Sequence, residues 1–141
     1  IVQCLVGSEM CIRDRDIDAS FKENRIDFAM AGLAFTLLDN NVPICSGGII
    51  PTWMGNAQGW AIASKRIFRN KIKAARLIKK RMDLLCVNNK IWRLQTAVKA
   101  DFKIGIRFAE FLEYRKEGLM VGYGPDKTDY FRMAKIYEFH R

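Results

Sequence analysis

The chain has 141 residues, of which 50% are hydrophobic, and its formal net charge is +9. This length supports one domain with a real core and is too short for two. No apolar run approaches the roughly 20 residues of a membrane-spanning helix, so no membrane partner is expected. The basic balance favours anionic partners such as nucleic acid, phosphate-bearing ligands or acidic surfaces, and a plainly solvated basic surface is the alternative.

The first 15 residues form a segment that stands apart from the rest of the chain. Residues 5–14, Leu-Val-Gly-Ser-Glu-Met-Cys-Ile-Arg-Asp, resemble a transposon-based sequencing adapter translated in frame, and the leftover bases accommodate Arg15. The chain lacks an initiating Met, which fits a fragment from a metagenomic assembly whose true start lies upstream. We therefore expect residues 1–15 to be foreign and loosely packed, and residues 16–141 to form a single domain.

The cysteines do not predict a metal site. Cys4 and Cys11 belong to the adapter-like segment, which leaves Cys45 and Cys86 far apart in the chain. A structural zinc site needs four nitrogen or sulfur ligands, and His140 is the only histidine that could join the two thiols. We expect no metal, and two buried thiols in a reducing cytoplasm.

Three strand-like segments precede the first long helix. Residues 34–38 have strand character, and the turn signal Asp39-Asn40-Asn41 follows them. Residues 42–50 and 57–63 have the pattern of two further strands with a turn between them. Because short connections join antiparallel neighbours, these segments predict an antiparallel meander.

Residues 64–86 predict the longest helix of the chain. Ser64 suits the N-cap position. Nine Lys and Arg residues occupy the outer faces, as a solvated surface or, alternatively, as a patch that attracts phosphates or nucleic acid. The apolar stripe at three- and four-residue steps consists of Ile67, Phe68, Ile72, Ala75, Ile78, Met82 and Leu85.

The rest of the chain completes a mixed α/β pattern. Residues 91–98 predict a strand, residues 104–114 an amphipathic helix, and the turn 122–126 a final hairpin. The whole order is β-β-β-α-β-α-β-β, which indicates a mixed α/β (α+β) domain around a mostly antiparallel sheet.

This order resembles the GNAT fold of acyl-CoA N-acyltransferases, most closely a phage-encoded branch that includes the GNAT-like internal virion proteins of T7-like phages. Residues 98–133 resemble the last third of that fold. Residues 42–53 resemble a small-residue strand that ends in Gly-Gly, two apolar residues and Pro, and residues 57–62 resemble the strand before the cofactor loop. The resemblance covers about residues 29–137 and implies a GNAT-like domain that is truncated at its N-terminus.

The resemblance also implies acetyl-CoA as cofactor. In this fold the strand before the long helix diverges from its neighbour, and the pantetheine arm pairs with the strand backbone. The pyrophosphate then lies on amides at the helix N-terminus, where the macrodipole favours anions. A gap between strand 57–63 and strand 91–98 is therefore required. The cofactor-binding residues that carry over are Ile62, Ala63, Ser64, Arg69, Asn70 and Lys71.

Several positions depart from the family pattern. Residues 69–74 match the phosphate signature Arg/Gln-x-x-Gly-x-Gly/Ala, but Ile72 replaces the first Gly and obstructs the approach to the backbone. Ala109 stands where many members carry the Tyr that protonates the leaving thiolate, and Phe102 stands where they carry an Asn. The catalytic residues are therefore unassigned.

The sequence is compatible with three functions. The fold implies a phage-encoded N-acetyltransferase that transfers an acyl group from acetyl-CoA to an amine in the cytoplasm of a bacterial host. The departures favour a catalytically degenerate virion protein whose partners are other virion proteins. A basic nucleic-acid-binding module is the third reading. Tyr114 or Tyr123 could supply a phenol, although a Tyr among apolar neighbours is more often a core residue.

Overall fold

The computed structural model describes residues 2–6 and 33–138. Its strands are β1 (Val2–Val6), β2 (Ala34–Asp39), β3 (Val42–Trp53), β4 (Asn56–Ser64), β5 (Arg93–Lys99), β6 (Arg115–Met120) and β7 (Tyr130–Ile136). Its helices are the 3-10 helix η2 (Lys65–Asn70) and the α-helices α2 (Lys71–Asn88) and α3 (Lys103–Phe111). From β2 onward this order is the predicted one.

The strands form one mixed sheet in the order β2-β3-β4-β5-β7-β6, and β1 pairs with β4 beside this path. β2, β3 and β4 form the predicted antiparallel meander. β5, β7 and β6 form a second antiparallel group. Among the described strands, β4 and β5 are the parallel pair, and the η2–α2 segment supplies the crossover that parallel strands need.

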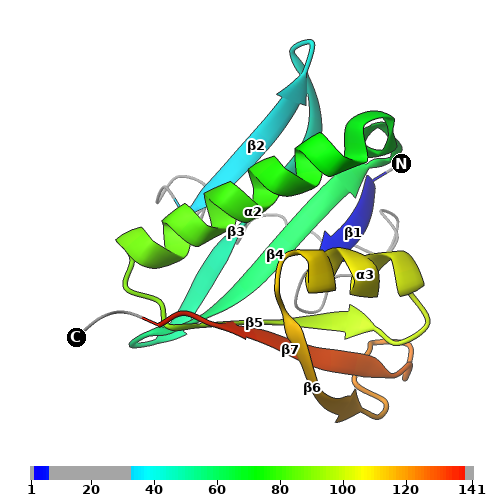
Figure 1. The fold of residues 1–141 in the computed structure, drawn as a ribbon. Helices are drawn as coiled ribbons and strands as arrows, with labels where there is room; N and C mark the ends of the chain where they lie inside the picture. The colour runs from blue at the N-terminus through cyan, green and yellow to red at the C-terminus, as the bar shows by residue number, and fades with distance from the viewer. Residues whose placement is uncertain (1, 7–32, 139–141) are drawn as a thin grey trace.

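β4 and β5 stay together at one end only. Their pairing joins residues 56–58 to residues 93–95, and beyond this point the two strands diverge (Figure 1). The gap required between them is therefore present. β1 enters this gap and pairs antiparallel with β4 along residues 61–64. The expected loose packing of residues 1–15 is thus wrong for Val2–Val6, whose backbone completes part of the sheet. The rest of that segment lies outside the described residues.

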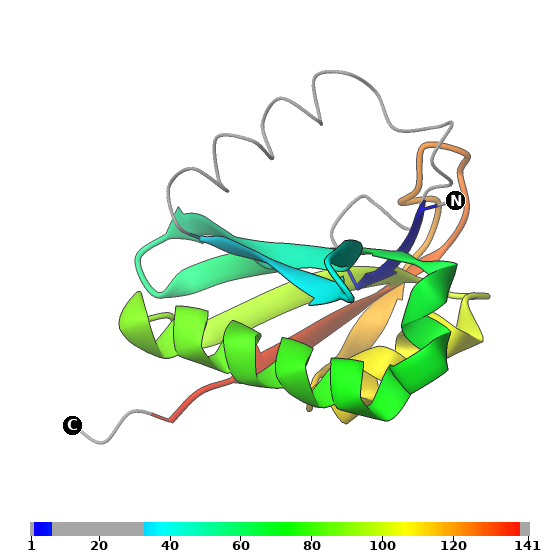
Figure 2. The ribbon, with the colours of Figure 1, turned by 90° about the horizontal axis from the view of Figure 1, so that it is seen from above.

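α2 and α3 lie on the same face of the sheet (Figure 2). From α2 the core receives Ala74, Ile78, Met82 and Cys86, which meet sheet residues such as Ile49, Leu94 and Met133 in one apolar cluster. The described helices include none that is long and apolar enough to cross a membrane.

The two thiols outside the adapter-like segment are buried and free, as predicted. Cys45 comes from β3 and Cys86 from the last turns of α2. Burial raises the pKa of the Cys45 thiol to about 12 and that of Cys86 to about 11. Both therefore stay protonated at neutral pH. Within the described ranges, no group of three or more His, Cys, Asp or Glu side chains gathers as a metal site would require; His140 lies outside them.

The long helix begins differently from the prediction. Residues 65–70 wind as a 3-10 helix, and α-helical geometry starts at Lys71. Ser64 precedes them in extended conformation, but its hydroxyl makes no capping hydrogen bond. Because a 3-10 turn holds three residues rather than 3.6, the apolar stripe is out of phase at this end. Phe68 and Ile72 consequently remain 43% and 59% exposed.

Candidate functional site

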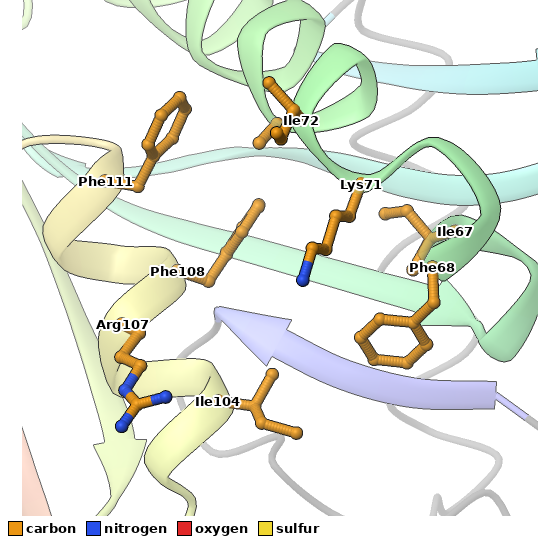
Figure 3. Close-up of a pocket in the computed structure, with 9 residues that line it drawn as sticks. Ile67, Phe68, Lys71, Ile72, Ile104, Arg107, Phe108 and Phe111 are labelled. Atoms are coloured by element: carbon orange, nitrogen blue, oxygen red, sulfur yellow. The ribbon is translucent and has the colours of Figure 1, made fainter.

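A pocket of about 440 Å³ opens between the start of the long helix and α3 (Figure 3). Phe68 and Ile72 form one wall, and Ile104 and Phe108 form the other. The walls are mainly apolar, so the pocket explains where the exposed side chains of the stripe point. The complete lining is Ile67, Phe68, Lys71, Ile72, Ala75, Ile104, Arg107, Phe108 and Phe111.

Two cations accompany these apolar walls. Lys71 extends from the first turn of α2 toward α3, and Arg107 contributes from α3 itself (Figure 3). A concave apolar site with a few convergent charged groups is typical of small-molecule binding. Here the charged groups are positive, so the pocket fits a ligand that combines an apolar or amide-containing chain with an anionic end.

The start of α2 reinforces this positive character. Its first turn carries no acidic residue, and Arg69, Lys71 and Lys73 are all exposed there. The helix macrodipole adds a partial positive charge at the same end. Arg69, Asn70 and Lys71 also line a second surface hollow that continues along α2. The structure thus brings these three sequence-predicted residues together at one anion-attracting helix end.

The other predicted cofactor residues lie at the end of β4. Ala63 is buried, whereas Ile62 and Ser64 are half-buried. Their backbones pair with β1, in the register Cys4 to Ile62, Gln3 to Ala63 and Val2 to Ser64. The backbone edge expected to receive a ligand is therefore occupied by the chain itself.

Sequence reasoning missed the α3 side of the pocket. Ile104, Arg107, Phe108 and Phe111 all line it, and the sequence assigned none of the four to the site, placing them only within a predicted amphipathic helix. Their spacing of three, one and three residues places them on one helix face. Because Ile104 and Phe111 are 52% and 46% exposed, this face is a second apolar stripe beyond the one that packs on the sheet.

The two candidate phenols occupy different environments. Tyr114 is 3% exposed, and its hydroxyl has no hydrogen-bond partner among the described residues. Burial raises the pKa of this phenol well above its ordinary value, so it stays neutral. Tyr123 lies at the β6–β7 end, edge-to-face with Tyr130 at 5.3 Å between ring centroids. Tyr114 lies instead beside Gly59, close to where β4 leaves β5.

Polar contact also marks the point of divergence itself. The fully buried Thr96 hydroxyl donates to the Gly59 carbonyl at 3.3 Å, bridging β5 and β4 just beyond their last paired residues. This bond lies one residue beyond the last backbone pairing between the two strands. Ala109 and Phe102 bring no functional group to the strand divergence. Ala109 is buried in the core, and Phe102 packs against the core.

A separate ionic cluster joins α2 to β7. Asp83 accepts hydrogen bonds from Lys135 Nζ at 2.9 Å and from Tyr137 Oη at 2.7 Å. Lys135 Nζ also lies 3.0 Å from Glu113 Oε2, and Lys79 Nζ lies 3.3 Å from Asp83 Oδ2. Burial opposes ionisation, but the bonds from Lys135 and Tyr137 hold the pKa of Asp83 below its ordinary value. The cluster fixes the far end of α2, away from the pocket.

No family model matches the chain, and no curated protein matches it in sequence. Solved structures do match it. A ribosomal-protein-alanine N-acetyltransferase from Brucella melitensis superposes with a TM-score of 0.71 at 11% identity, covering 86% of this chain and 80% of that one. A GNAT-family acetyltransferase from Bacillus anthracis gives 0.66 at 16% identity, covering 91% and 77%. The chain has the GNAT fold.

A variant of the spermidine N-acetyltransferase from Vibrio cholerae shows the same likeness, with a TM-score of 0.68 at 17% identity over 88% of this chain and 84% of that one. At such low identities the likeness establishes the GNAT fold, and the predicted fold class is confirmed. The phage branch and the adapter origin of residues 1–15 stay predictions.

Proposed function

We propose that this GNAT-fold chain binds an acyl-CoA in the pocket between α2 and α3 and acts as an N-acetyltransferase toward an amine. The divergence of β4 from β5 beside this pocket carries the proposal. An extended amide chain can enter such a gap, and its anionic end can reach the positive start of α2. Acetyl-CoA combines these two features in one molecule.

Each part of the ligand has a matching part of the site. Arg69 and Lys71 suit the phosphates, because ammonium and guanidinium groups both bind phosphate oxygens. The apolar walls from Phe68 and Phe108 suit the alkyl portions of the pantetheine arm. Residues 61–64 of β4 carry the backbone groups that suit its amides, although β1 pairs with them in this structure. Ile72 opposes the fit, because its side chain lies in the pocket where the family has no side chain.

The reaction itself requires two proton movements. The amine nitrogen attacks the thioester carbonyl, the carbon–sulfur bond breaks, the amine loses a proton, and the thiolate gains one. Tyr114 is a neutral phenol beside Gly59 at the strand divergence, but it is buried in the core. The described residues therefore supply a binding site more completely than they supply an acid and a base.

This imbalance favours one alternative, a catalytically degenerate GNAT-fold protein of the phage virion. Ala109 carries no dissociable group, and it is fully buried. A protein of this kind would retain the fold and the pocket without turning over acetyl-CoA. Binding and catalysis must therefore be measured separately.

Calorimetric titration with acetyl-CoA tests the binding proposal. We expect a dissociation constant no tighter than about 100 μM, near −5.5 kcal/mol. The double substitution Arg69→Ala/Lys71→Ala should weaken binding further, more so at low salt. Arg81→Ala/Lys103→Ala is the charge-matched control, because both side chains are exposed and neither lines the pocket or the adjoining hollow. Equal losses in the two double variants would contradict a specific phosphate site.

Thiol release in the presence of amines separates the enzyme from its alternative. Spermidine and a peptide with an N-terminal alanine are suitable acceptors, since the structural neighbours named for them share this fold. Release of CoA that depends on the amine supports the acetyltransferase. Binding without release supports the degenerate virion protein, and no binding by a folded chain overturns the proposal.

A further inference from the structure

One edge of β4 is shared between two different neighbours. Residues 56–58 pair with β5, and residues 61–64 pair with β1. The register of β1 shifts between Cys4 and Val6, so the ladder carries a bulge at this place. β1 is therefore a short, irregular strand held in the opening that β5 leaves free.

The covered edge would be an open site without β1. Ala61 and Ala63 are only 2% and 1% exposed. Among the described residues, β1 is the strand that pairs with them along the β4 edge opposite β3. Buried backbone N–H and C=O groups require partners, and an unpaired strand edge is a ready template for an extended chain. Figure 3 shows β1 running past the pocket between β4 and α3. The covered edge therefore lies beside the pocket.

We propose that β1, which belongs to the segment expected to be foreign, is an intramolecular competitor for residues 61–64 of β4, the strand edge that the proposed function gives to an extended diamide ligand. The proposal rests on the proposed function, which makes the pantetheine arm of acyl-CoA the diamide ligand. Ligand and β1 cannot both occupy the edge, so binding requires β1 to leave. The apparent dissociation constant then equals the intrinsic one divided by the fraction of molecules in which β1 is detached.

A proline in β1 tests the competition in the full chain. Gln3→Pro removes a backbone N–H and disfavours the ladder, whereas Gln3→Ala retains both and is the matched control. We expect Gln3→Pro to tighten the binding of CoA about tenfold or more, and Gln3→Ala to leave it unchanged. Equal affinities of the two variants would overturn the proposal.

A disulfide provides the opposite test by holding β1 in place. Cys4 and Ile62 are register partners, and residues directly opposed in an antiparallel ladder have Cβ atoms about 4.5–5.5 Å apart, close to disulfide geometry. In an Ile62→Cys chain that also carries Cys11→Ser, mild oxidation should join positions 4 and 62. The buried thiols Cys45 and Cys86 compete poorly, because burial raises their pKa values.

We expect the oxidised chain to lose at least tenfold in CoA affinity and reduction to restore it, and we expect CoA to slow disulfide formation. The chain with Cys4→Ser added should show none of these effects. The disulfide could form while no chain binds CoA, the Gln3→Pro variant included. The proposed function would then fail, and β1 would have no such ligand to exclude. CoA binding that ignores both Gln3→Pro and the disulfide would overturn the competition while leaving the proposed function intact.

Discussion

The hydroxyl of Tyr114 lies 2.7 Å from the point where a Cβ atom on Gly59 would stand. The glycine therefore makes room for a phenol that is buried in the core without a hydrogen-bond partner among the described residues. Gly59 also directly follows the last residue of β4 that pairs with β5. The core next to the strand divergence is thus shaped by this one contact.

This contact predicts a coupled response to mutation. Gly59→Ala should destabilise the chain by about 1–3 kcal/mol, because the added methyl group meets the hydroxyl and the Met82 side chain. Tyr114→Phe alone should be neutral or stabilising by up to about 1 kcal/mol, because it removes an unsatisfied buried hydroxyl. In the Tyr114→Phe background, Gly59→Ala should lower the free energy of unfolding by less than it does in the wild type. Urea unfolding of the four chains measures the coupling.

The same set of variants separates a structural phenol from a catalytic one. A Tyr114→Phe chain that unfolds more easily by more than about 1 kcal/mol would mean that the hydroxyl has a partner after all. Unchanged stability together with lost thiol release would assign Tyr114 the role of acid. Unchanged stability together with unchanged thiol release would support Tyr114 as a structural residue of the core.

The Asp83 cluster predicts a loss of stability in acid. The pKa of Asp83 is lower in the folded chain than in the unfolded one, so its contribution is complete above the unfolded pKa of about 3.9. This contribution is lost as the pH falls through the folded pKa. Urea unfolding between pH 6 and pH 2 should show the decline, and Asp83→Asn should flatten it.

Removal of Asp83 should also be costly at neutral pH. Lys135 is a buried ammonium whose side chain is 10% exposed, and Asp83→Ala leaves it only the more exposed Glu113 as carboxylate partner. We expect a loss of about 2–4 kcal/mol, somewhat below the range for a fully buried pair because Asp83 is 30% exposed. Asp126→Ala is the control, since Asp126 is exposed and lies 3.6 Å from Lys99, and it should change the stability much less. Similar losses in both variants would contradict this reading.

The adapter reading of residues 5–14 predicts a result in the source DNA. The original reads should contain adapter bases at these codons, and a library prepared without that adapter should contain the gene without them. Recovery of the same segment from such an independent library would show that it is native. β1 would then be an evolved part of the sheet rather than an accidental occupant of the β4 edge.

Local patterns predicted most of the fold. Turn signals and hydrophobic periodicity gave the eight elements from β2 to β7 in the correct order, because both depend on residues near one another in sequence. Element ends depended on distant contacts. β5 starts at Arg93 rather than at Ile91, where the backbone N–H groups of Trp92 and Arg93 both donate to the Gly55 carbonyl. α3 ends at Phe111, two residues before Glu113 takes a positive φ of 71°.

Part of the site was predictable because its residues are near one another in sequence. Arg69, Asn70 and Lys71 are contiguous, so a motif could find them, and they line one hollow at the start of α2. Their role in cofactor binding stays a prediction. The α3 wall required knowing that Phe108 faces Ile72 across the pocket, which follows from how two helices pack and not from either segment alone. The pairing of β1 with β4 joins residues that are remote in sequence, and no local pattern indicates it.

Ile72 offers the most direct test of the phosphate end of the site. Ile72→Gly should tighten acetyl-CoA binding, because it removes a side chain that is 59% exposed in the pocket and opens the approach to the backbone amides at the start of α2. The substitution should cost about 1 kcal/mol of stability through helix propensity, without a large cavity cost, since the side chain is not in the core.

Leu84→Gly is the matched control for this substitution. Leu84 is 42% exposed on the same helix and lines neither the pocket nor the adjoining hollow. Calorimetry should therefore show tighter binding for Ile72→Gly alone, while thermal unfolding shows similar losses for both variants. If wild type already binds more tightly than about 10 μM and Ile72→Gly changes nothing, the pyrophosphate does not approach this helix end, and the alignment of residues 69–74 with the phosphate signature is wrong.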